Sequence, residues 1–157
     1  MQTEVLTAGN IDRAAEIIRR GGLVAVPTET VYGLAGSGLN AETVERIYAV
    51  KGRPEVKPLS LMVHDASAMA ACWREVPAQA LSLAEEFWPG PLTIIGDSVD
   101  GIPEIVRAGG STVGLRCPDH PLTLELLQKC AVPLAAPSAN PSGKPSPKTA
   151  REVLEYF

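Results

Sequence analysis

Hydrophobic positions recur every three to four residues in six segments of the chain, and this spacing predicts six amphipathic helices. Each segment follows a residue that can cap a helix, or a proline: Asn10, Asn40, Asp65 or Ser67, Pro77, Asp119 or His120, and Thr149. The expected helices cover residues 11–20, 41–50, a short stretch towards 72, 78–87, a segment after 120, and 150–157. In the fourth helix, Leu81, Ala84 and Phe87 are expected to face the core.

Short apolar or β-branched runs lie between these helices and predict strands. The candidate strands are 23–26, 59–63, 92–95, 112–116 and 132–136, whereas 101–107 is expected to be irregular and 137–147 to be a loop. Strands and helices therefore alternate, with no internal repeat and no linker-like segment. This order predicts a single α/β domain.

The first strand leads directly into a polar stretch. Pro27 lacks an N–H and cannot continue a ladder, so the residues after it are expected to form a loop. Four of the next five positions carry polar side chains: Thr28, Glu29, Thr30 and Tyr32. Open α/β sheets bind ligands at the carboxyl ends of their strands, which favours a binding site here. The alternative is a capped turn that leads to the next element.

Three cations gather where the second helix is expected to end. Lys51 and Arg53 flank Gly52, and Lys57 follows between two prolines. An ammonium and a guanidinium together suit a polyphosphate, because the first acts as a point charge and the second can donate two parallel hydrogen bonds. The glycine allows a tight turn and favours a ligand. The alternative is favourable cationic charge at a helix C-terminus.

Two further polar clusters end strands. Thr112 and Arg116 share one side of the predicted strand 112–116, and Arg116 needs either a structural carboxylate or a substrate carboxylate as its partner. Residues 136–146 follow the last strand and are rich in small polar side chains, among them Ser138, Asn140 and Ser146. Such side chains can hydrogen-bond a phosphate, a ribose or a base, although a stretch of this kind can also be a plain turn.

Composition narrows the classes of function. The 157 residues carry a formal net charge of −4, so no overall basic field attracts a nucleic acid. Three cysteines without C-x-x-C spacing argue against a disulfide framework and a zinc site and fit a reducing cytoplasm. No signal-peptide pattern opens the chain and no apolar run is long enough to span a membrane. Phosphate-loop and dinucleotide-binding glycine motifs are absent.

Taken together, these motifs resemble those of the YrdC/TsaC family, the L-threonylcarbamoyladenylate synthases. The resemblance rests on four stretches in order: Pro27-Thr28-Glu29-Thr30-Val31-Tyr32-Gly33-Leu34, Lys51-Gly52-Arg53, Thr112-Val113-Gly114-Leu115-Arg116-Cys117-Pro118, and Ser138-Ala139-Asn140. It implies a twisted mixed sheet flanked by helices, with a concave ligand-binding face. It also implies that L-threonine, bicarbonate and ATP are joined into threonylcarbamoyl-AMP with release of pyrophosphate, for the t6A modification of tRNA.

The resemblance also implies roles for single residues. Lys51 and Arg53 would be catalytic and bind ATP, while Thr30 and Arg116 would bind L-threonine, with Arg116 on its carboxylate. Further ATP contacts would come from Lys57, Thr112, Ser138, Asn140 and Ser146. A magnesium ion is expected with ATP, although the sequence shows no dedicated metal site. Cytoplasmic t6A-transferase enzymes are the expected partners, with tRNA as a further candidate and no membrane.

Two features differ from the family pattern. Met62 stands where many relatives have histidine, which leaves open an enzyme that carbamoylates another acceptor. The family continues with a further Ser-Thr-Val strand, whereas this sequence ends at Phe157, so the domain 1–157 is expected to lack that C-terminal strand segment. A third hypothesis is a non-catalytic module that binds double-stranded RNA, which the negative net charge disfavours.

Overall fold

The computed structural model describes residues 2–54 and 57–157 as one α/β domain. Its helices are α1 (Ile11–Arg19), α2 (Ala41–Lys51), α3 (Met69–Cys72), α4 (Ala78–Phe87), α5 (Pro121–Cys130) and α6 (Ala150–Tyr156), with short 3₁₀ turns at Ala8–Asn10 and Ala66–Ala68. Its strands are β1 (Val24–Val26), β2 (Gly33–Ser37), β3 (Leu61–Met62), β4 (Ile94–Asp97), β5 (Thr112–Arg116) and β6 (Leu134–Ala135). The predicted fold class is confirmed.

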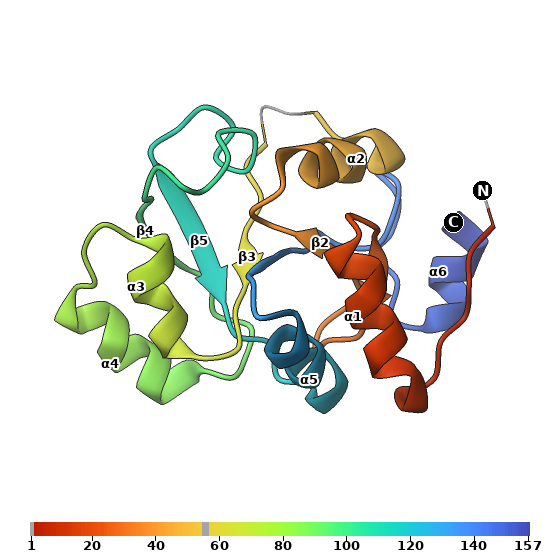
Figure 1. The fold of residues 1–157 in the computed structure, drawn as a ribbon, viewed down its shortest axis with the longest axis horizontal. Helices are drawn as coiled ribbons and strands as arrows, with labels where there is room; N and C mark the ends of the chain where they lie inside the picture. Colours follow the sequence, from red (N-terminus) through yellow and green to blue (C-terminus); the bar gives the residue numbers. More distant parts are fainter. Residues whose placement is uncertain (1, 55–56) are drawn as a thin grey trace.

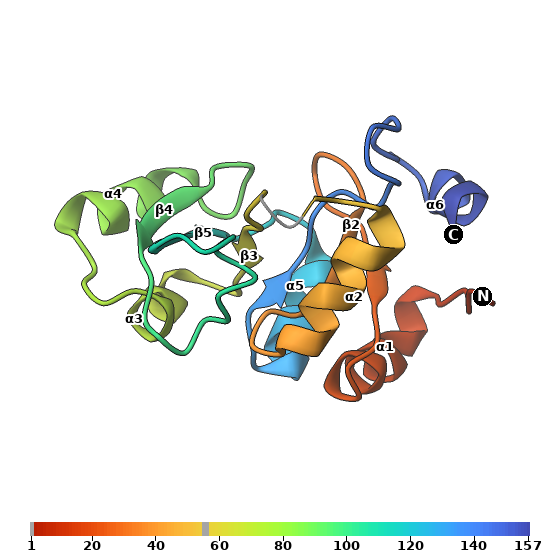
Figure 2. The same cartoon turned by 90° about the horizontal axis from the view of Figure 1, so that it is seen from above.

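The strands form one mixed sheet in the order β1-β2-β6-β3-β5-β4. Only β3 and β5 run parallel; the other neighbouring pairs are antiparallel. Figures 1 and 2 both show β3 between two groups of elements, with α3, α4, β4 and β5 on one side and α1, α2 and α5 on the other. The two chain ends lie near each other beside α6 (Figure 1). None of the helices in the described ranges is long and apolar enough to span a membrane.

Alternate residues of the central strands enter two separate hydrophobic cores. Leu61 of β3 and Ala135 of β6 belong to a core shared with α2, α3 and α4. Their neighbours Met62 and Leu134 belong to a second core shared with α1 and α5. This is the period-two geometry of a strand, so β3 and β6 are covered on both faces and therefore read as apolar runs in the sequence.

Helix capping agrees with the sequence at most starts. The side chains of Asn40, Asp65, His120 and Thr149 each accept a hydrogen bond from a backbone N–H of the first turn. Asn10 differs, because its Oδ1 accepts from the N–H and hydroxyl of Thr7 and makes no bond to α1. The predicted cap of α1 is therefore wrong in detail, since Asn10 closes the preceding 3₁₀ turn instead.

Strand β2 contradicts the prediction that the residues after Pro27 form only a loop. Its sequence, Gly33-Leu34-Ala35-Gly36-Ser37, lacks β-branched residues and has the composition of a turn. The glycine at 36 is required by packing rather than by a turn, because a Cβ there would lie 2.6 Å from Thr43 Cγ2 and 2.8 Å from Leu23 Cδ2. Small residues let α2 approach this strand closely, and they hide its strand character in the sequence.

The inner face predicted for α4 is also partly wrong. Ala84 is buried, but Leu81 is 48% and Phe87 53% exposed, and the second buried position is Ala80. The two alanines allow the helix to pack closely, while Leu81 lies a quarter-turn away from Ala80 and Phe87 is the last helical residue before the chain turns away. Residues 101–107 contain no helix or strand, as predicted.

We expect Gly36→Ala to destabilise the protein by about 1–3 kcal/mol, because the added methyl would be forced against Thr43 and Leu23 in a closely packed interior. Urea denaturation of both proteins measures this as a lower midpoint with an unchanged slope. Gly101→Ala is the matched control, since a Cβ at Gly101 would meet only Val99 Cγ2, at 4.0 Å. Equal midpoints for the two variants would contradict the packing role of Gly36.

Candidate functional site

A cavity of about 220 Å³ opens over the middle of the sheet and collects residues from three of the four sequence motifs. Its walls come from the turn after α2, the chain through β3, the residue before β4, the end of β5 and the segment after β6. The lining residues are Arg53, Pro58, Leu59, Ser60, Leu61, Met62, Thr93, Arg116, Ala136, Pro137 and Ser138. Two guanidinium groups from distant parts of the chain therefore face one space, which suits an anionic ligand.

The floor of the cavity depends on a glycine. A Cβ at Gly114 of β5 would lie 2.8 Å from Thr93 Cγ2 and 3.1 Å from Ser60 Oγ. Ser60 and Thr93 line the cavity, so the missing side chain at Gly114 allows both to approach β5. Neither residue stood out in the sequence, because each belongs to a strand region with no polar motif of its own.

The turn after α2 separates Lys51 from Arg53. Gly52 adopts the left-handed conformation, with φ of 62°, and ends the helix. Arg53 lines the cavity and donates from Nη2 to the carbonyl of Pro58 at 3.1 Å. Its Nε is buried and has no hydrogen-bond partner in the part of the chain that the structure describes. Arg53 therefore has donor capacity left for a ligand.

Lys51 does not line the cavity, and its side chain extends into the loop after β6. It is 3% exposed, and its ammonium donates to the carbonyl oxygens of Ser138 and Asn140. The backbone of the same loop returns to the helix, since the N–H of Ser142 donates to the carbonyl of Lys51 at 2.7 Å. Burial lowers the pKa of Lys51 to about 8, with a smaller contribution from the charge of Arg53. Lys51 thus joins the two motifs rather than lining the space between them.

The loop after β6 is held from both sides. Its Ala139 N–H donates to the carbonyl of Tyr32, and the N–H of Leu34 donates to the carbonyl of Pro137. Asn140 is 6% exposed and donates from Nδ2 to the carbonyls of Pro141 and Lys144, at 3.0 and 2.8 Å. Its Oδ1 is buried and lacks a partner among the described residues. Ser138 lines the cavity, so the Ser-x-Asn motif places a serine in the cavity wall beside a turn that Asn140 holds by hydrogen bonds.

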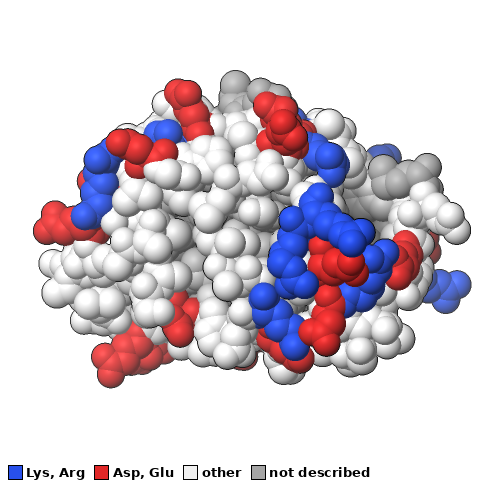
Figure 3. Space-filling view, in the orientation of Figure 1, with Lys and Arg blue, Asp and Glu red and all other residues white. Residues whose placement is uncertain are grey.

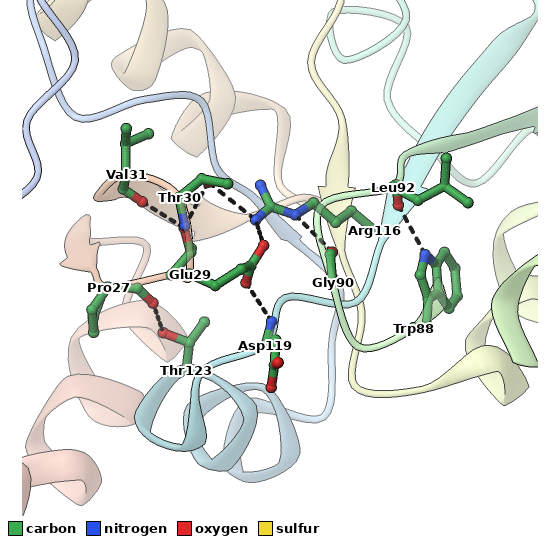
Figure 4. Close-up of polar contacts among 11 residues, drawn as sticks. Pro27, Glu29, Thr30, Val31, Trp88, Gly90, Leu92, Arg116, Asp119 and Thr123 are labelled. Carbon is green, nitrogen blue, oxygen red and sulfur yellow. Dashed lines mark hydrogen bonds and ion pairs between the residues drawn. The ribbon is translucent and has the colours of Figure 1, made fainter. Parts of the chain in front are cut away.

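The polar stretch after Pro27 packs against the end of β5, as Figure 4 shows. Arg116 donates from Nη2 to the Glu29 carboxylate and to Thr30 Oγ1, the latter at 3.2 Å, and from Nε to the carbonyl of Gly90 at 3.1 Å. Glu29 also accepts the backbone N–H of Asp119 at 2.6 Å. The structure therefore supplies a carboxylate partner for Arg116 from within the chain.

Glu29 and Arg116 form a partly buried ion pair, with side chains 23% and 17% exposed. Burial raises the pKa of Glu29, but backbone hydrogen bonds, including that from Asp119, and the Arg116 guanidinium outweigh this effect and hold the pKa below its usual range. Within the same turn, Thr28 Oγ1 donates to the carbonyl of Val31 at 2.6 Å and accepts the N–H of Thr30 at 3.1 Å. Thr30 is therefore held beside Arg116, which lines the cavity.

Three further predicted ATP contacts neither line this cavity nor contact the residues that do in the manner of Lys51 and Asn140. Thr112 is exposed at the start of β5, opposite Asp97 and at the far end of the strand from Arg116. Lys57 and Ser146 are exposed and do not line the cavity. Their contacts with ATP stay predictions. The structure thus brings together Thr30, Arg53, Arg116 and Ser138, with Lys51 and Asn140 directly behind them.

The charged surface above α1 is mixed rather than uniformly basic. Figure 3 shows lysine and arginine side chains interleaved with carboxylates on this face. Arg13 pairs with Glu4 and Glu16, at 3.2 and 3.0 Å, and Lys129 pairs with Asp12 at 2.9 Å. These carboxylates offset the positive field that a nucleic-acid backbone would require, so this face does not favour the RNA-binding hypothesis.

A family model and individual relatives agree on the protein family to which this chain is similar. The Sua5/YciO/YrdC family model, described as "Telomere recombination", matches residues 16–157. The threonylcarbamoyl-AMP synthase of Pyrococcus abyssi is 44% identical over 144 residues, which cover 92% of this chain and 42% of that protein. The threonylcarbamoyl-AMP synthase of Bacillus subtilis is 45% identical over 144 residues, which cover 91% of this chain and 42% of that protein.

A solved structure agrees with these relatives. The crystal structure of P. abyssi Sua5 complexed with L-threonine superposes with a TM-score of 0.93 at 43% identity, covering 98% of this chain and 45% of that one. The present chain thus spans less than half the length of these relatives. The fold that forms the cavity is therefore shared with P. abyssi Sua5 over nearly the whole length of the present chain.

Proposed function

This chain belongs to the Sua5/YciO/YrdC family, and on that premise we propose that it synthesises L-threonylcarbamoyladenylate from L-threonine, bicarbonate and ATP, releasing pyrophosphate. The product would serve the t6A modification of tRNA. The observation that carries the proposal is the single cavity into which Arg53, Arg116 and Ser138 project from three separate motifs. A carboxylate and a polyphosphate are both anions, and two guanidinium groups on one space suit them together.

The proposed roles follow from the hydrogen-bond donors of each residue that its contacts with the described residues do not use. Arg116 holds the amino-acid carboxylate beside Thr30, whose hydroxyl it already contacts at 3.2 Å. Arg53 binds ATP phosphates with its remaining N–H groups, and Ser138 adds a hydroxyl. Lys51 supports the phosphate site through the carbonyls of Ser138 and Asn140, and contributes positive charge close behind Arg53.

In the proposed reaction, the amine of threonine adds to bicarbonate with loss of water, giving a carbamate. A carbamate oxygen then attacks the α-phosphorus of ATP, and the bond to pyrophosphate breaks as the new P–O bond forms. No covalent bond to the protein is required. The side chains therefore act by aligning two anions and by stabilising the charge that develops on the phosphates.

The magnesium ion that accompanies ATP is part of the substrate in this proposal. The described residues contain no group of three or more histidine, cysteine, aspartate or glutamate side chains that could hold a metal. Beside the cavity, the carboxylate of Glu29 is already engaged by Arg116 and by the N–H of Asp119. These residues do not fit a metal site of the protein's own, and the ion would be held by the phosphates.

The experiment that tests the function is pyrophosphate release from ATP and bicarbonate, with and without L-threonine, followed by identification of the adenylate by mass spectrometry. Threonine-dependent release and a threonylcarbamoyl-AMP mass are expected. Release with another amine instead of threonine would assign a different carbamoyl acceptor, consistent with Met62 in the cavity wall. Salt-sensitive binding of double-stranded RNA without any turnover would support the non-catalytic hypothesis.

The partners and the compartment are part of the same proposal. An acyl adenylate hydrolyses readily in water, so the enzymes that transfer the threonylcarbamoyl group to tRNA are the expected downstream partners. Three free, buried cysteines fit the reducing cytoplasm where those enzymes would act.

We expect kcat/KM for ATP to fall as the pH rises above about 8, because the free protein then loses the ammonium of Lys51. The sign follows from the lowered pKa: below about 8 Lys51 is cationic and donates to the loop, and above it the charge near the phosphates is lost. A pH series from 6.5 to 9.5 measures the alkaline midpoint. Lys51→Arg should move that midpoint upwards; an unchanged midpoint would assign it to another group.

A further inference from the structure

The hydrogen-bond donors of Arg116 are divided between the protein and the cavity. The N–H of Nε is engaged by the Gly90 carbonyl, and Nη2 contacts both Glu29 and Thr30 (Figure 4). A guanidinium has five N–H bonds, so these contacts use three of them. The two on Nη1 have no partner in residues 2–54 and 57–157, and Arg116 lines the cavity. The protein thereby leaves one nitrogen of Arg116 for an incoming anion.

Glu29 determines which N–H groups of Arg116 are bonded to the protein and which face the cavity. One of its carboxylate oxygens accepts from Arg116, and the other accepts the backbone N–H of Asp119, at the start of the turn into α5. The Thr28–Val31 turn, closed by the Thr28 hydroxyl, holds Glu29 from the other side. A flexible arginine is thus held by a carboxylate that is itself anchored at two points, which is a preorganised arrangement.

We propose that Glu29 is a positioning residue for L-threonine binding: it orients the Arg116 guanidinium so that Nη1 faces the carboxylate of the amino acid. This deepens the proposed function and rests on it, since Arg116 is taken to bind that carboxylate. Glu29 does not touch the reacting atoms and remains a carboxylate throughout the reaction.

Two opposite effects of Glu29 can be distinguished by experiment. As a positioning group, it lowers the KM for threonine, because Arg116 needs no reorientation when the ligand binds. As a negative charge close to a second carboxylate, it would raise that KM by repulsion. The direct contacts of Glu29 with Arg116 and Asp119 favour the first effect, since Arg116 lies between Glu29 and the cavity.

The test compares Glu29→Gln, Glu29→Asp and Glu16→Gln in pyrophosphate release. Glu29→Gln should raise the KM for L-threonine about tenfold, roughly the effect of weakening one charge-assisted hydrogen bond, with kcat and the KM for ATP within about twofold. Glu29→Asp keeps the charge and should recover most of the loss. Glu16, which also pairs with an arginine but lies on α1, is the matched control and should leave all constants unchanged. A lower KM for threonine in Glu29→Gln would overturn the proposal.

A second measurement needs no turnover. In the ¹⁵N-labelled protein, the Nε–H of Arg116 should exchange slowly with solvent, because it is bonded to Gly90 and the group is held by Glu29. Glu29→Gln should accelerate this exchange at least about tenfold while thermal unfolding stays within a few degrees. Unchanged exchange would overturn the positioning role. Absence of threonine-dependent turnover in the unmodified protein, with accelerated exchange in the variant, would refute the proposed function but support the orientation of Arg116 by Glu29.

Discussion

Arg53→Ala should lower ATP-dependent pyrophosphate release about 100- to 1000-fold. Of the two cations in the Lys-x-Arg motif, Arg53 lines the cavity, whereas the ammonium of Lys51 donates to carbonyl oxygens of the loop after β6. Loss of a preorganised donor to charge that develops in the transition state typically has an effect of this size. The assay is steady-state pyrophosphate release at saturating L-threonine and bicarbonate, with ATP varied.

The control for this prediction is Arg74→Ala. Arg74 pairs with Asp100 on the surface and its side chain is 58% exposed, so the same substitution there should leave turnover unchanged. The fold should survive in both variants, since the Arg53 side chain makes one hydrogen bond to the described residues, to the Pro58 carbonyl. Turnover of Arg53→Ala within threefold of the unmodified protein would rule out Arg53 as the phosphate ligand.

Arg116→Lys should lower kcat/KM for L-threonine about 100-fold while the KM for ATP stays within about threefold. Arg116 contacts Glu29, Thr30 and Gly90 and still presents Nη1 to the cavity. A lysine ammonium has three donors at a single point and cannot reach these partners and a ligand carboxylate together. Initial rates at varied threonine and fixed ATP measure the change.

The lysine variant keeps the positive charge beside Glu29, so a large loss of folding stability is not expected. This separates it from Arg116→Ala, which would leave the partly buried Glu29 carboxylate without its charged partner. Arg107→Lys provides the control, because Arg107 also donates to backbone carbonyls but lies outside the cavity. Equal effects on the threonine and ATP constants would contradict a carboxylate-specific role for Arg116.

The elements that could be predicted from sequence are those whose signal is local. Helix α2 follows an Asn40 cap, buries Val44, Ile47 and Tyr48, and ends at Gly52, all of which local spacing indicates. Strand β2 could not be found in this way, because its glycine at 36 reflects the approach of α2, a tertiary contact. The exposure of Leu81 and Phe87 has the same cause, since two alanines rather than the larger residues set how α4 packs.

The residues of the site likewise fall into those that local sequence motifs predict and those that depend on tertiary packing. The sequence motifs predicted Arg53, Ser138 and Arg116 as site residues, and all three line one cavity, because each lies at or just after the end of a helix or strand. The motifs left open whether the partner of Arg116 is a carboxylate of the protein or of a substrate. In the structure Glu29, which lies 87 positions earlier, is a protein carboxylate that pairs with Arg116. The direction of Lys51 and the contributions of Ser60 and Thr93 depend on how distant segments pack, which spacing along the chain does not encode.

The order of the strands has a consequence for how the protein is made. Strands β2 and β3 do not pair with each other; each pairs with β6, which a ribosome would synthesise last of the six. The sheet therefore stays open in a nascent chain until Leu134 and Ala135 emerge, and contacts between such distant segments form slowly. The cavity-lining residues Ala136–Ser138 directly follow β6, so closure of the sheet and assembly of the anion site are one event. Nucleotide affinity should accordingly appear late in translation and only in chains that include β6 and the segment after it.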